Sequence, residues 1–528
     1  TAPCRTRQTR VSLEGTRLRM KITFVQPPAL MAVDNYSTIT QPPLGIAYLA
    51  AYVRSKGHEA VVVDAVGEAV TRLTPWPKRE KRLFQGLSFP EIIERIPKDS
   101  DVIGLSCMFT HAWPMVRELA NEISKAFPKA RLIMGGEHVT SMYIKVLAET
   151  KAELCVLGEG EITLLELLEA YENGKPVSEI AGLAIRGEDG KAHKTPKRQR
   201  IADPDILPLP AWDLMDPMAY LEGEVFMGPQ AGRSIPMLAT RGCPFRCTFC
   251  SSPQMWTQVW KPRDPLKVAD EMEHWKKVYG ASDFQFQDLT AIVRKDWIIA
   301  FCRELIRRDL KITWSLPVGT RSEAIDGEVP GLLMKSGCHH VTYAPESGSE
   351  DILKSIEKRV HLDHLEKSAK DSLDAGMKVC LFLIVGFPQE TPDDVKKTFA
   401  FIRKMARLGV HEIAVSTFVP LPGTQLFDET NRIIRIEADD EYCYWMTGAT
   451  SLWTVRSWNP HLSDGRLRWL KLWGMSQFYA LSYLHHPGRL WRLFSNLWNS
   501  RQETKVDRVI QEFANKFRAV TKQPKVGV

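Results

Sequence analysis

The sequence of 528 residues has no uninterrupted apolar run that reaches the roughly 18 residues needed for a membrane-spanning helix. The segment before Met20 also lacks the apolar core of a signal peptide. Ten cysteines without such a signal do not suit a secreted disulfide framework in a chain of this size. These absences predict a cytoplasmic protein, because thiols stay reduced there. We expect residues 1–19 to form a disordered leader or an expression remnant.

The chain also has little excess charge. Its formal net charge is +7, and five arginines against one glutamate in residues 1–19 supply +4 of it, which leaves +3 for the rest. That balance gives no basis for nucleic-acid binding. The composition, with 44% hydrophobic and 25% charged residues, is that of an ordinary globular protein.

Residues 20–195 alternate between apolar, β-branched segments and segments with helical periodicity. We expect strands at 21–26, 60–65, 102–107, 131–136 and 153–158. This α/β alternation is typical of a doubly wound, Rossmann-like parallel sheet, which binds ligands at the carboxyl ends of its strands. Residues 182–195 predict a β-hairpin, and the proline-rich residues 196–230 predict a linker.

A second alternation runs through residues 231–435. Its expected strands are 236–240, 283–288, 311–316, 340–344, 379–385 and 412–418. Six βα units predict a partial (β/α)6 barrel rather than a full eight-fold one. Residues 436–528 are rich in Trp, Tyr, Arg and Lys and are expected to form a C-terminal helical domain.

Three cysteines stand close together after the first expected barrel strand. They are Cys243, Cys247 and Cys250, in the segment TRGCPFRCTFCSS. Three thiolates on one short loop can ligate three irons of a 4Fe–4S cubane and leave the fourth iron open. A zinc knuckle is the alternative, but it normally needs a fourth ligand, and no further Cys or His stands close by in the sequence. The spacing therefore favours a cluster.

The cysteine segment and several segments C-terminal to it resemble the radical S-adenosylmethionine (SAM) superfamily. YAPESGSEDILKSIEK at 343–358 and LIVGFPQET at 383–391 resemble the family's fourth-strand and fifth-strand segments, and PLPGTQLFDE at 420–429 resembles the end of its barrel. In that family the open iron chelates SAM, and reductive cleavage gives a 5′-deoxyadenosyl radical. The resemblance implies SAM contacts at Phe249, Gln287, Glu346, Ser347 and Gly386.

Each of these segments also has a structural explanation. A glutamate at a strand end often caps a helix, and a glycine there often makes a turn. Relatives often carry two aspartates after the second strand, whereas this chain has Gln287 and Asp288. The order of the segments, more than any one of them, identifies the family.

The first domain resembles the cobalamin-binding domain of one radical SAM subfamily, through QPPAL, QPPLGIAYLAAY, LIMGGEHVT at 132–140 and VLGEGEITLLELL at 156–167. The chain lacks the Asp-x-His-x-x-Gly motif that supplies a histidine to cobalt in other cobalamin proteins, as do many relatives in this subfamily. His111 is expected to be a solvated loop residue rather than a ligand. The resemblance implies cobalamin contacts at Pro43, Leu44, Cys107, Met108, Phe109, Thr110, Gly135, Gly136, Glu137, Gly158 and Glu159.

With both cofactors, the resemblance implies radical methyl transfer through cobalamin to an unactivated carbon of a small-molecule substrate. Two alternatives stay open: radical cyclisation, oxidation or rearrangement of a tetrapyrrole or lipid without methyl transfer, and a non-catalytic binding module. No catalytic side chain is assigned beyond the cofactors, although Cys443 is a candidate hydrogen donor.

The expected partners are a small substrate and an electron donor such as flavodoxin or ferredoxin. The apolar stripe of residues 466–484 predicts a helical cap on the barrel mouth. Its alternative is a cavity or a peripheral membrane contact for a hydrophobic substrate.

Overall fold

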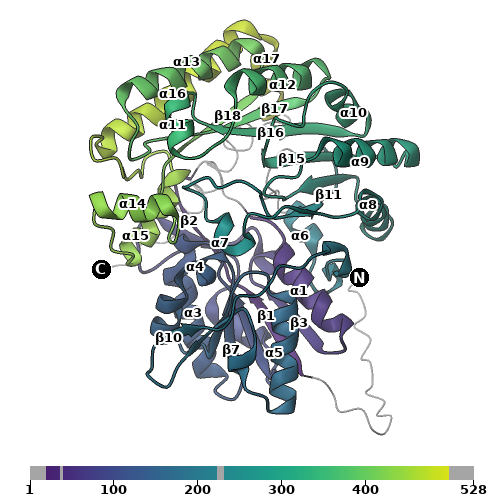
Figure 1. Ribbon diagram of the computed structural model, residues 1–528, viewed down its shortest axis with the longest axis vertical. Coiled ribbons are helices and arrows are strands. Elements are labelled where there is room, and N and C mark those ends of the chain that lie inside the picture. The colour runs from purple at the N-terminus through teal and green to yellow at the C-terminus, as the bar shows by residue number, and fades with distance from the viewer. Residues whose placement is uncertain (1–19, 36–39, 223–230, 499–528) are drawn as a thin grey trace.

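The computed structural model describes residues 20–35, 40–222 and 231–498. The expected leader and residues 499–528 of the expected C-terminal domain lie outside these ranges. The described chain forms two halves, which are stacked in Figure 1 with the N-terminal half below and the barrel half above. The short helix α7 (Ser252–Trp256) lies where the two halves meet.

A seven-stranded sheet forms the centre of the N-terminal half, in the order β10-β9-β8-β7-β6-β1-β3. Strands β8, β7, β6, β1 and β3 are parallel, whereas β9 and β10 form the expected antiparallel hairpin. The doubly wound fold is therefore confirmed. The strands are β1 (Lys21–Gln26), β3 (Glu59–Asp64), β6 (Val102–Ser106), β7 (Arg131–Gly135), β8 (Leu154–Val156), β9 (Leu183–Arg186) and β10 (Ala192–Lys194).

Helices cover both faces of this sheet, which is why β1 is buried at successive positions rather than at alternate ones. Contacts join α1 to α5 in one layer, and α2, α3 and α4 in the other. The helices are α1 (Leu44–Ser55), α2 (Phe89–Arg95), α3 (Trp113–Ala126), α4 (Glu137–Glu149) and α5 (Glu161–Asn173), with the 3-10 turns η1 (Gly67–Ala69), η2 (Thr110–Ala112) and η3 (Val177–Glu179).

Two parts of this half differ from a plain alternation. A small antiparallel sheet, β2-β5-β4, is inserted between the parallel strands and consists of β2 (Ala29–Ala32), β4 (Leu73–Pro75) and β5 (Arg82–Gln85). The described part of the expected linker is folded, with η4 (Pro204–Ile206), η5 (Trp212–Leu214) and α6 (Pro217–Glu222). Tyr220 of α6 is fully buried and donates to Asp64 at the end of β3 at 2.8 Å, so this segment packs on the first sheet.

A six-stranded parallel sheet forms the barrel half, in the sequential order β11-β14-β15-β16-β17-β18. This is the expected partial barrel. Its strands are β11 (Ser234–Met237), β14 (Asp283–Phe286), β15 (Thr313–Thr320), β16 (Cys338–Glu346), β17 (Lys378–Val385) and β18 (Glu412–Thr417). Its outer helices are α8 (Pro265–Tyr279), α9 (Lys295–Arg308), α10 (Val329–Lys335), α11 (Glu350–Ser355), α12 (Leu362–Asp374) and α13 (Pro392–Leu408).

The C-terminal elements return to both halves. They are α14 (Gln425–Ile433), α15 (Asp440–Trp445), η6 (Met446–Ala449), α16 (Asp464–His485) and α17 (Gly488–Trp498). Helix α15 binds the first half, because Asp440 forms a bidentate ion pair with Arg117 of α3. Helix α16 packs on α13 and on β18, the edge strand of the barrel. Within the described ranges, no helix has the length and apolar character needed to cross a bilayer.

Candidate functional site

The three clustered cysteines lie on the loop between the two-residue strand β12 (Thr240–Arg241), which pairs with β13 (Lys261–Pro262), and α7. Backbone hydrogen bonds fix this loop: Thr248 donates to the carbonyl of Ile356 at 3.0 Å and accepts from the amide of Leu426 at 2.9 Å. All three thiols are free of disulfides. Burial raises the pKa of the Cys250 thiol to about 12, so a metal is needed to hold it as thiolate.

The sulfurs of Cys243, Cys247 and Cys250 do not all lie within 4.8 Å of one another, which suits a cluster better than a single ion. Among the described residues, the group whose ligand atoms all lie within 4.8 Å of one another is His340, Cys380 and Glu412, which is elsewhere in the barrel. The sulfurs of one zinc ion lie closer together than 4.8 Å, because each is about 2.3 Å from the metal. In a cubane, three thiolates bind three different irons and stand further apart. The loop therefore fits a 4Fe–4S cluster.

Two cations flank this loop. Lys358 forms a buried ion pair with Glu346 at 2.8 Å, and the Arg321 guanidinium lies 3.7 Å from the ring centre of Phe245. Although burial opposes it, the charge of Glu346 holds the pKa of Lys358 above its usual value, so its ammonium stays charged. Burial raises the pKa of Cys247, and the charges of Lys358 and Arg321 act in the opposite direction. These cations therefore favour anionic sulfur at the barrel mouth.

Glu346 itself has an unusual backbone. It ends β16 at φ 69°, in the left-handed region that a glutamate rarely adopts. Such a conformation turns the chain sharply at the strand's carboxyl end and directs the carboxylate to Lys358. The predicted contact between Glu346 and SAM stays a prediction, and its partner among the described residues is Lys358.

The interior of the barrel carries buried polar atoms that have no hydrogen-bond partner among the described residues. Both amide atoms of Gln285 and the amide nitrogen of Gln287 belong to this set. Such atoms are costly unless a ligand or water satisfies them. They fit a polar ligand such as SAM or a substrate inside the barrel. Further buried polar atoms of this kind belong to residues of β15 and β16 and to the residue after β15, namely Ser315, Thr320, Thr342 and Arg321.

The remaining residues with implied SAM contacts lie around the same mouth. Phe249 is half-buried, with its ring 5.9 Å from that of Phe387. Ser347 is buried and shares a 3.0 Å hydrogen bond with Thr398, which suits a structural role. Gly386 has φ 87°, and a side chain there would approach Leu467 of α16 to 2.7 Å, so glycine is required for packing as well.

In the N-terminal half, the carboxyl end of β7, which lies beside that of β6, forms a glycine crest, which is Gly135 and Gly136. Gly136 has φ 120°, and a Cβ there would collide with the carbonyl of Cys107. In the loop after β6, the side chains of Met108 and Phe109 are 42% and 53% exposed. A bare backbone beside exposed apolar side chains fits a large flat ligand such as the corrin of cobalamin.

The rest of the implied cobalamin loop is internally bonded. Thr110 shares a 3.0 Å hydrogen bond with Nδ1 of His138, and the His138 ring packs on Trp113. His111 is half-buried and stacks on Phe109, so it is not the solvated loop residue that the sequence predicts. Burial lowers the pKa of His111 to about 4, so its ring is neutral. At the start of α1, Leu44 is buried and Pro43 is half-buried.

Glu159 and Glu137, which the resemblance assigns to cobalamin, lie at the contact between the two halves. Glu159 pairs with Arg200 at 2.9 Å and Arg241 at 3.3 Å, and Arg241 pairs with Glu161 at 2.7 Å. All four side chains are buried. Since Arg241 stands two residues before Cys243, this network ties the cluster loop to the first half.

Glu137 makes a second tie. It heads α4 directly after the glycine crest and accepts a hydrogen bond from Ser251, the residue after Cys250. One turn further, Ser141 donates to Gln254 of α7 at 2.9 Å. Gly158, at φ 70°, lies near Met255 of the same helix. Helix α4 begins directly after the glycine crest, where cobalamin is predicted to bind, and α7 begins directly after the cysteine loop. The α4–α7 contact therefore joins the two predicted cofactor sites.

Several residues of this site escaped the sequence reasoning. Arg241 gives a local signal, since it closely precedes the cysteine motif, but its partners are distant in the chain. Asp288 accepts from the amides of Ala239 and Thr240 and so fixes the strand that leads to the cysteines; burial raises the pKa of Asp288 to about 6. His138 stands in the GGEHVT segment, but no local pattern distinguishes it as a site residue.

Cys443 does not reach the cysteine loop in the described contacts. It lies in α15, is buried, and is close enough to Cys107 for their thiols to influence one another. Helix α15 contacts η2 and α3 of the first half. Its role as a hydrogen donor stays a prediction.

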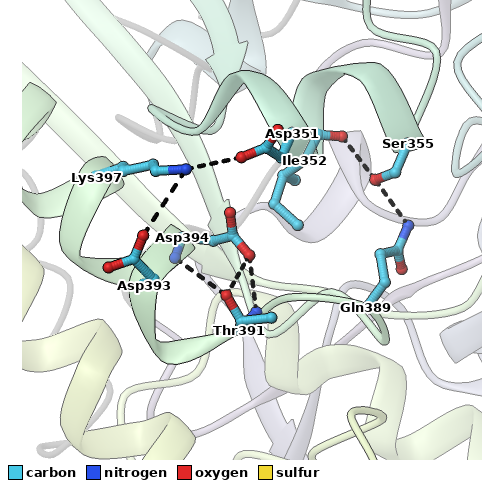
Figure 2. Close-up of a pocket in the computed structure, with 8 residues that line it drawn as sticks. All are labelled: Asp351, Ile352, Ser355, Gln389, Thr391, Asp393, Asp394 and Lys397. Atoms are coloured by element: carbon cyan, nitrogen blue, oxygen red, sulfur yellow. Dashed lines mark hydrogen bonds and ion pairs between the residues drawn. The ribbon is translucent and has the colours of Figure 1, made fainter.

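Figure 2 shows a surface pocket between α11 and the start of α13. Lys397 lies between Asp351 at 2.7 Å and Asp393 at 3.8 Å. Asp394 and Thr391 bond each other as the capping box of α13. Because its charged groups satisfy one another, this pocket is a weaker candidate site than the barrel interior. Its other lining residues are Ile352, Ser355 and Gln389.

Comparisons with known proteins match both halves. The model of the radical SAM superfamily matches residues 237–402, and the model of the B12-binding domain matches residues 35–168. The chain is 29% identical over 413 residues to an uncharacterized methyltransferase of Pyrococcus horikoshii, which covers 78% of this chain and 83% of that protein. It is 27% identical over 488 residues to cytidylyl-2-hydroxyethylphosphonate methyltransferase of Streptomyces wedmorensis, which covers 86% and 89%.

A third relative has a different kind of activity in its name. It is the anaerobic magnesium-protoporphyrin IX monomethyl ester cyclase of Rubrivivax gelatinosus, 28% identical over 410 residues, covering 76% of this chain and 68% of that protein.

Two solved structures share the fold. One is the methyltransferase TsrM of Kitasatospora setae with cobalamin and a [4Fe-4S] cluster bound, with a TM-score of 0.63, 18% identity and coverage of 88% and 89%. The other is OxsB with aqua-cobalamin and S-adenosylmethionine bound, with a TM-score of 0.66, 15% identity and coverage of 96% and 79%.

Proposed function

Since this chain belongs to the radical SAM superfamily and carries a B12-binding domain, we propose that it transfers a methyl group through cobalamin to an unactivated carbon of a small-molecule substrate. The observation that carries this proposal is the α4–α7 contact. The Glu137–Ser251 hydrogen bond joins the helix after the glycine crest to the loop that holds Cys250. Methyl transfer requires that both cofactors face one substrate, and this contact fixes the two sites relative to each other.

When the cofactors are bound, SAM cleaved at the cluster supplies the radical that removes substrate hydrogen, and cobalamin supplies the methyl group. Cys243, Cys247 and Cys250 hold the cluster on a loop fixed by backbone hydrogen bonds. Lys358 and Arg321 supply positive charge beside the cysteine loop, which would suit the carboxylate of SAM. The polar atoms of β14 and β15 that have no partner among the described residues would orient the polar parts of the ligands.

Product analysis under anaerobic conditions tests this function. The reconstituted protein is supplied with SAM, cobalamin and a reductant, and the SAM products are quantified by mass spectrometry. Methyl transfer predicts equal amounts of 5′-deoxyadenosine and S-adenosylhomocysteine when substrate is present. The formation of 5′-deoxyadenosine without S-adenosylhomocysteine contradicts methyl transfer. If neither product forms, the result supports a non-catalytic binding module.

Radical cyclisation, oxidation or rearrangement without methyl transfer is the second candidate. The similarity to the magnesium-protoporphyrin cyclases supports it, because those relatives match the chain about as well as the methyltransferases do. The mass of the product separates the two functions. A methylated product gains one CH2 unit, whereas cyclisation leaves no such increment.

For partners and location, we propose a flavodoxin or ferredoxin as electron donor and a cytoplasmic protein with peripheral membrane contact. Helices α16 and α17 support that contact with exposed Trp469, Trp473, Trp491 (78%) and Phe494 (60%), beside basic Arg492. Co-flotation with anionic vesicles tests it. Trp491→Ser with Phe494→Ser should reduce binding, whereas Trp453→Ser, which removes an exposed tryptophan elsewhere, should not.

A further inference from the structure

We propose that the barrel holds a second metal site, for a divalent cation such as zinc, formed by His340, Cys380 and Glu412. These three side chains are all buried, and their ligand atoms all lie within 4.8 Å of one another. They are separate from the cluster cysteines and take no part in the proposed methyl transfer. The site would therefore be a structural one.

The strands bring the three ligands together without help from loops. Cys380 of β17 pairs in register with Glu412 of β18, and with Thr342 of β16 on its other side. His340 stands two residues before Thr342, so both project to the same face of β16. Side chains carried on adjacent strands are held more rigidly than side chains on loops, which favours a preformed metal site.

The position of the site separates it from the SAM chemistry. His340 lies six residues before Glu346 on β16, which corresponds to roughly 20 Å along a strand. Glu412 is the first residue of β18. The group is thus toward the amino ends of the strands, at the base of the barrel, whereas the cysteine loop is at the mouth. In parallel barrels, the base contributes mainly to stability.

The donor set favours zinc. Imidazole nitrogen, thiolate sulfur and carboxylate oxygen are the three kinds of zinc ligand in proteins, and zinc sites usually take four ligands. Burial raises the pKa of the Tyr479 hydroxyl, and both Glu412 and Cys380 add to this, so Tyr479 of α16 lies beside the group. A water molecule or this hydroxyl can complete the coordination. A divalent cation would offset the charge of a buried carboxylate and a buried thiolate. A hydrogen-bonded polar cluster without metal is the alternative.

Metal analysis of the full-length holoenzyme tests the site. The cluster is first assembled anaerobically, the protein is then incubated with zinc sulfate, and loose metal is removed by gel filtration. Elemental analysis counts zinc beside iron. We expect one zinc per chain in the parent protein and a loss of at least about fivefold in Cys380→Ser, since removing one of three ligands weakens such a site strongly.

Cys302→Ser is the matched control, because Cys302 is also buried in the barrel half but lies in α9, outside the group. Zinc that binds to vacant cluster cysteines is equal in all three proteins and cancels in the comparison. Cobalt(II) in place of zinc gives a second readout, a thiolate-to-metal absorption band that should vanish only in Cys380→Ser. The proposal is overturned if the parent protein retains no zinc, or if Cys380→Ser and Cys302→Ser retain the same amount. The first of these outcomes does not depend on whether a variant folds.

Discussion

The two parallel sheets of this protein end very differently at their carboxyl edges. The N-terminal sheet ends in the glycine crest and the exposed side chains of Met108 and Phe109. The barrel ends in buried charged groups that are paired with one another, such as Glu346 with Lys358. The first edge offers backbone and apolar surface, which suit a large flat ligand. The second offers charge and hydrogen bonds, which suit a small zwitterion and an iron–sulfur cluster.

A buried ionic network joins these two edges. Arg241 precedes the cysteine loop, and its partners Glu159 and Glu161 belong to the N-terminal half. Buried ion pairs add little net stability over apolar packing but fix geometry, because losing one partner is very costly. The two sheets therefore suit different ligand chemistries, and buried charged contacts fix the position of one sheet relative to the other. Four changes test this division, in order of decreasing expected effect.

The largest effect should come from Cys247→Ala. It removes one iron ligand, so we expect bound iron and 5′-deoxyadenosine formation to fall to background. Cobalamin binding, which depends on the other sheet, should stay at the parent level by difference spectroscopy. Cys302→Ala is the control and should retain full iron content. Loss of cobalamin together with iron would contradict the separation of the two sites.

Arg241→Met should give the next largest effect. The substitution removes the positive charge that pairs with the buried carboxylates of Glu159 and Glu161. Removing one partner of a buried ion pair typically lowers the free energy of unfolding by about 3–5 kcal/mol. We expect a clearly lower midpoint in denaturant unfolding. Arg294→Met breaks the exposed pair with Asp296 and should leave the unfolding midpoint close to that of the parent protein, because solvent screens exposed pairs. Equal midpoints for the two variants would show that the network is not important for stability.

Glu390 at the barrel mouth provides a pH test. It accepts from the amide of Gly386 at 2.5 Å, and burial raises the pKa of Glu390 to about 7. Because the folded-state pKa is above the unfolded value, the folded protein loses stability as the pH rises from about 4.5 to 7, and the loss is complete above pH 7. Glu390→Gln stays neutral, so it should gain up to about 3 kcal/mol on the parent over this range. The gain is read from unfolding midpoints between pH 5 and 8; a constant difference would contradict the shift.

Gly135→Val should give the smallest of the four effects. A Cβ at Gly135 meets its nearest protein atom at 3.7 Å, which is ordinary van der Waals contact, so the added side chain starts without a clash and occupies space at the crest. We expect cobalamin affinity to fall about tenfold, or about 1.4 kcal/mol, with the iron content unchanged. Gly331→Ala in α10, where a Cβ meets nothing within 4 Å, is the control. Unchanged affinity would place the cobalamin elsewhere.

Much of the architecture could be predicted from the sequence, because strand and helix periodicities are local. The strands of both sheets, the hairpin of β9 and β10 and the six-stranded partial barrel were predicted near their observed positions. The small sheet β2-β5-β4 was not, because its strands are only three or four residues long and β2 pairs with β5 across some fifty residues. The prolines of the segment before residue 223 predict a linker, yet Tyr220 is buried against Asp64.

The candidate site was predictable to a similar degree. The cysteine triad is a local spacing and needed no structure. Glu137 and Glu159 were selected by resemblance, but their partners Ser251 and Arg241 became visible only when the two halves were placed together. His111 was expected to be solvated, whereas it stacks on Phe109, and burial lowers its pKa to about 4 so that it is neutral.

The sequence by itself determined the order of strands and helices, the family resemblance and the three cysteines, since these depend on neighbours within a few residues. Only the tertiary structure decided which charged groups meet, because Arg241 and Glu159, or His340 and Glu412, are some seventy or more residues apart. Burial is also a tertiary property, because it depends on all the elements packed around a residue. It raises the pKa of Glu390, and it leaves the side-chain amide of Gln285 without a partner in the part of the chain that the structure describes.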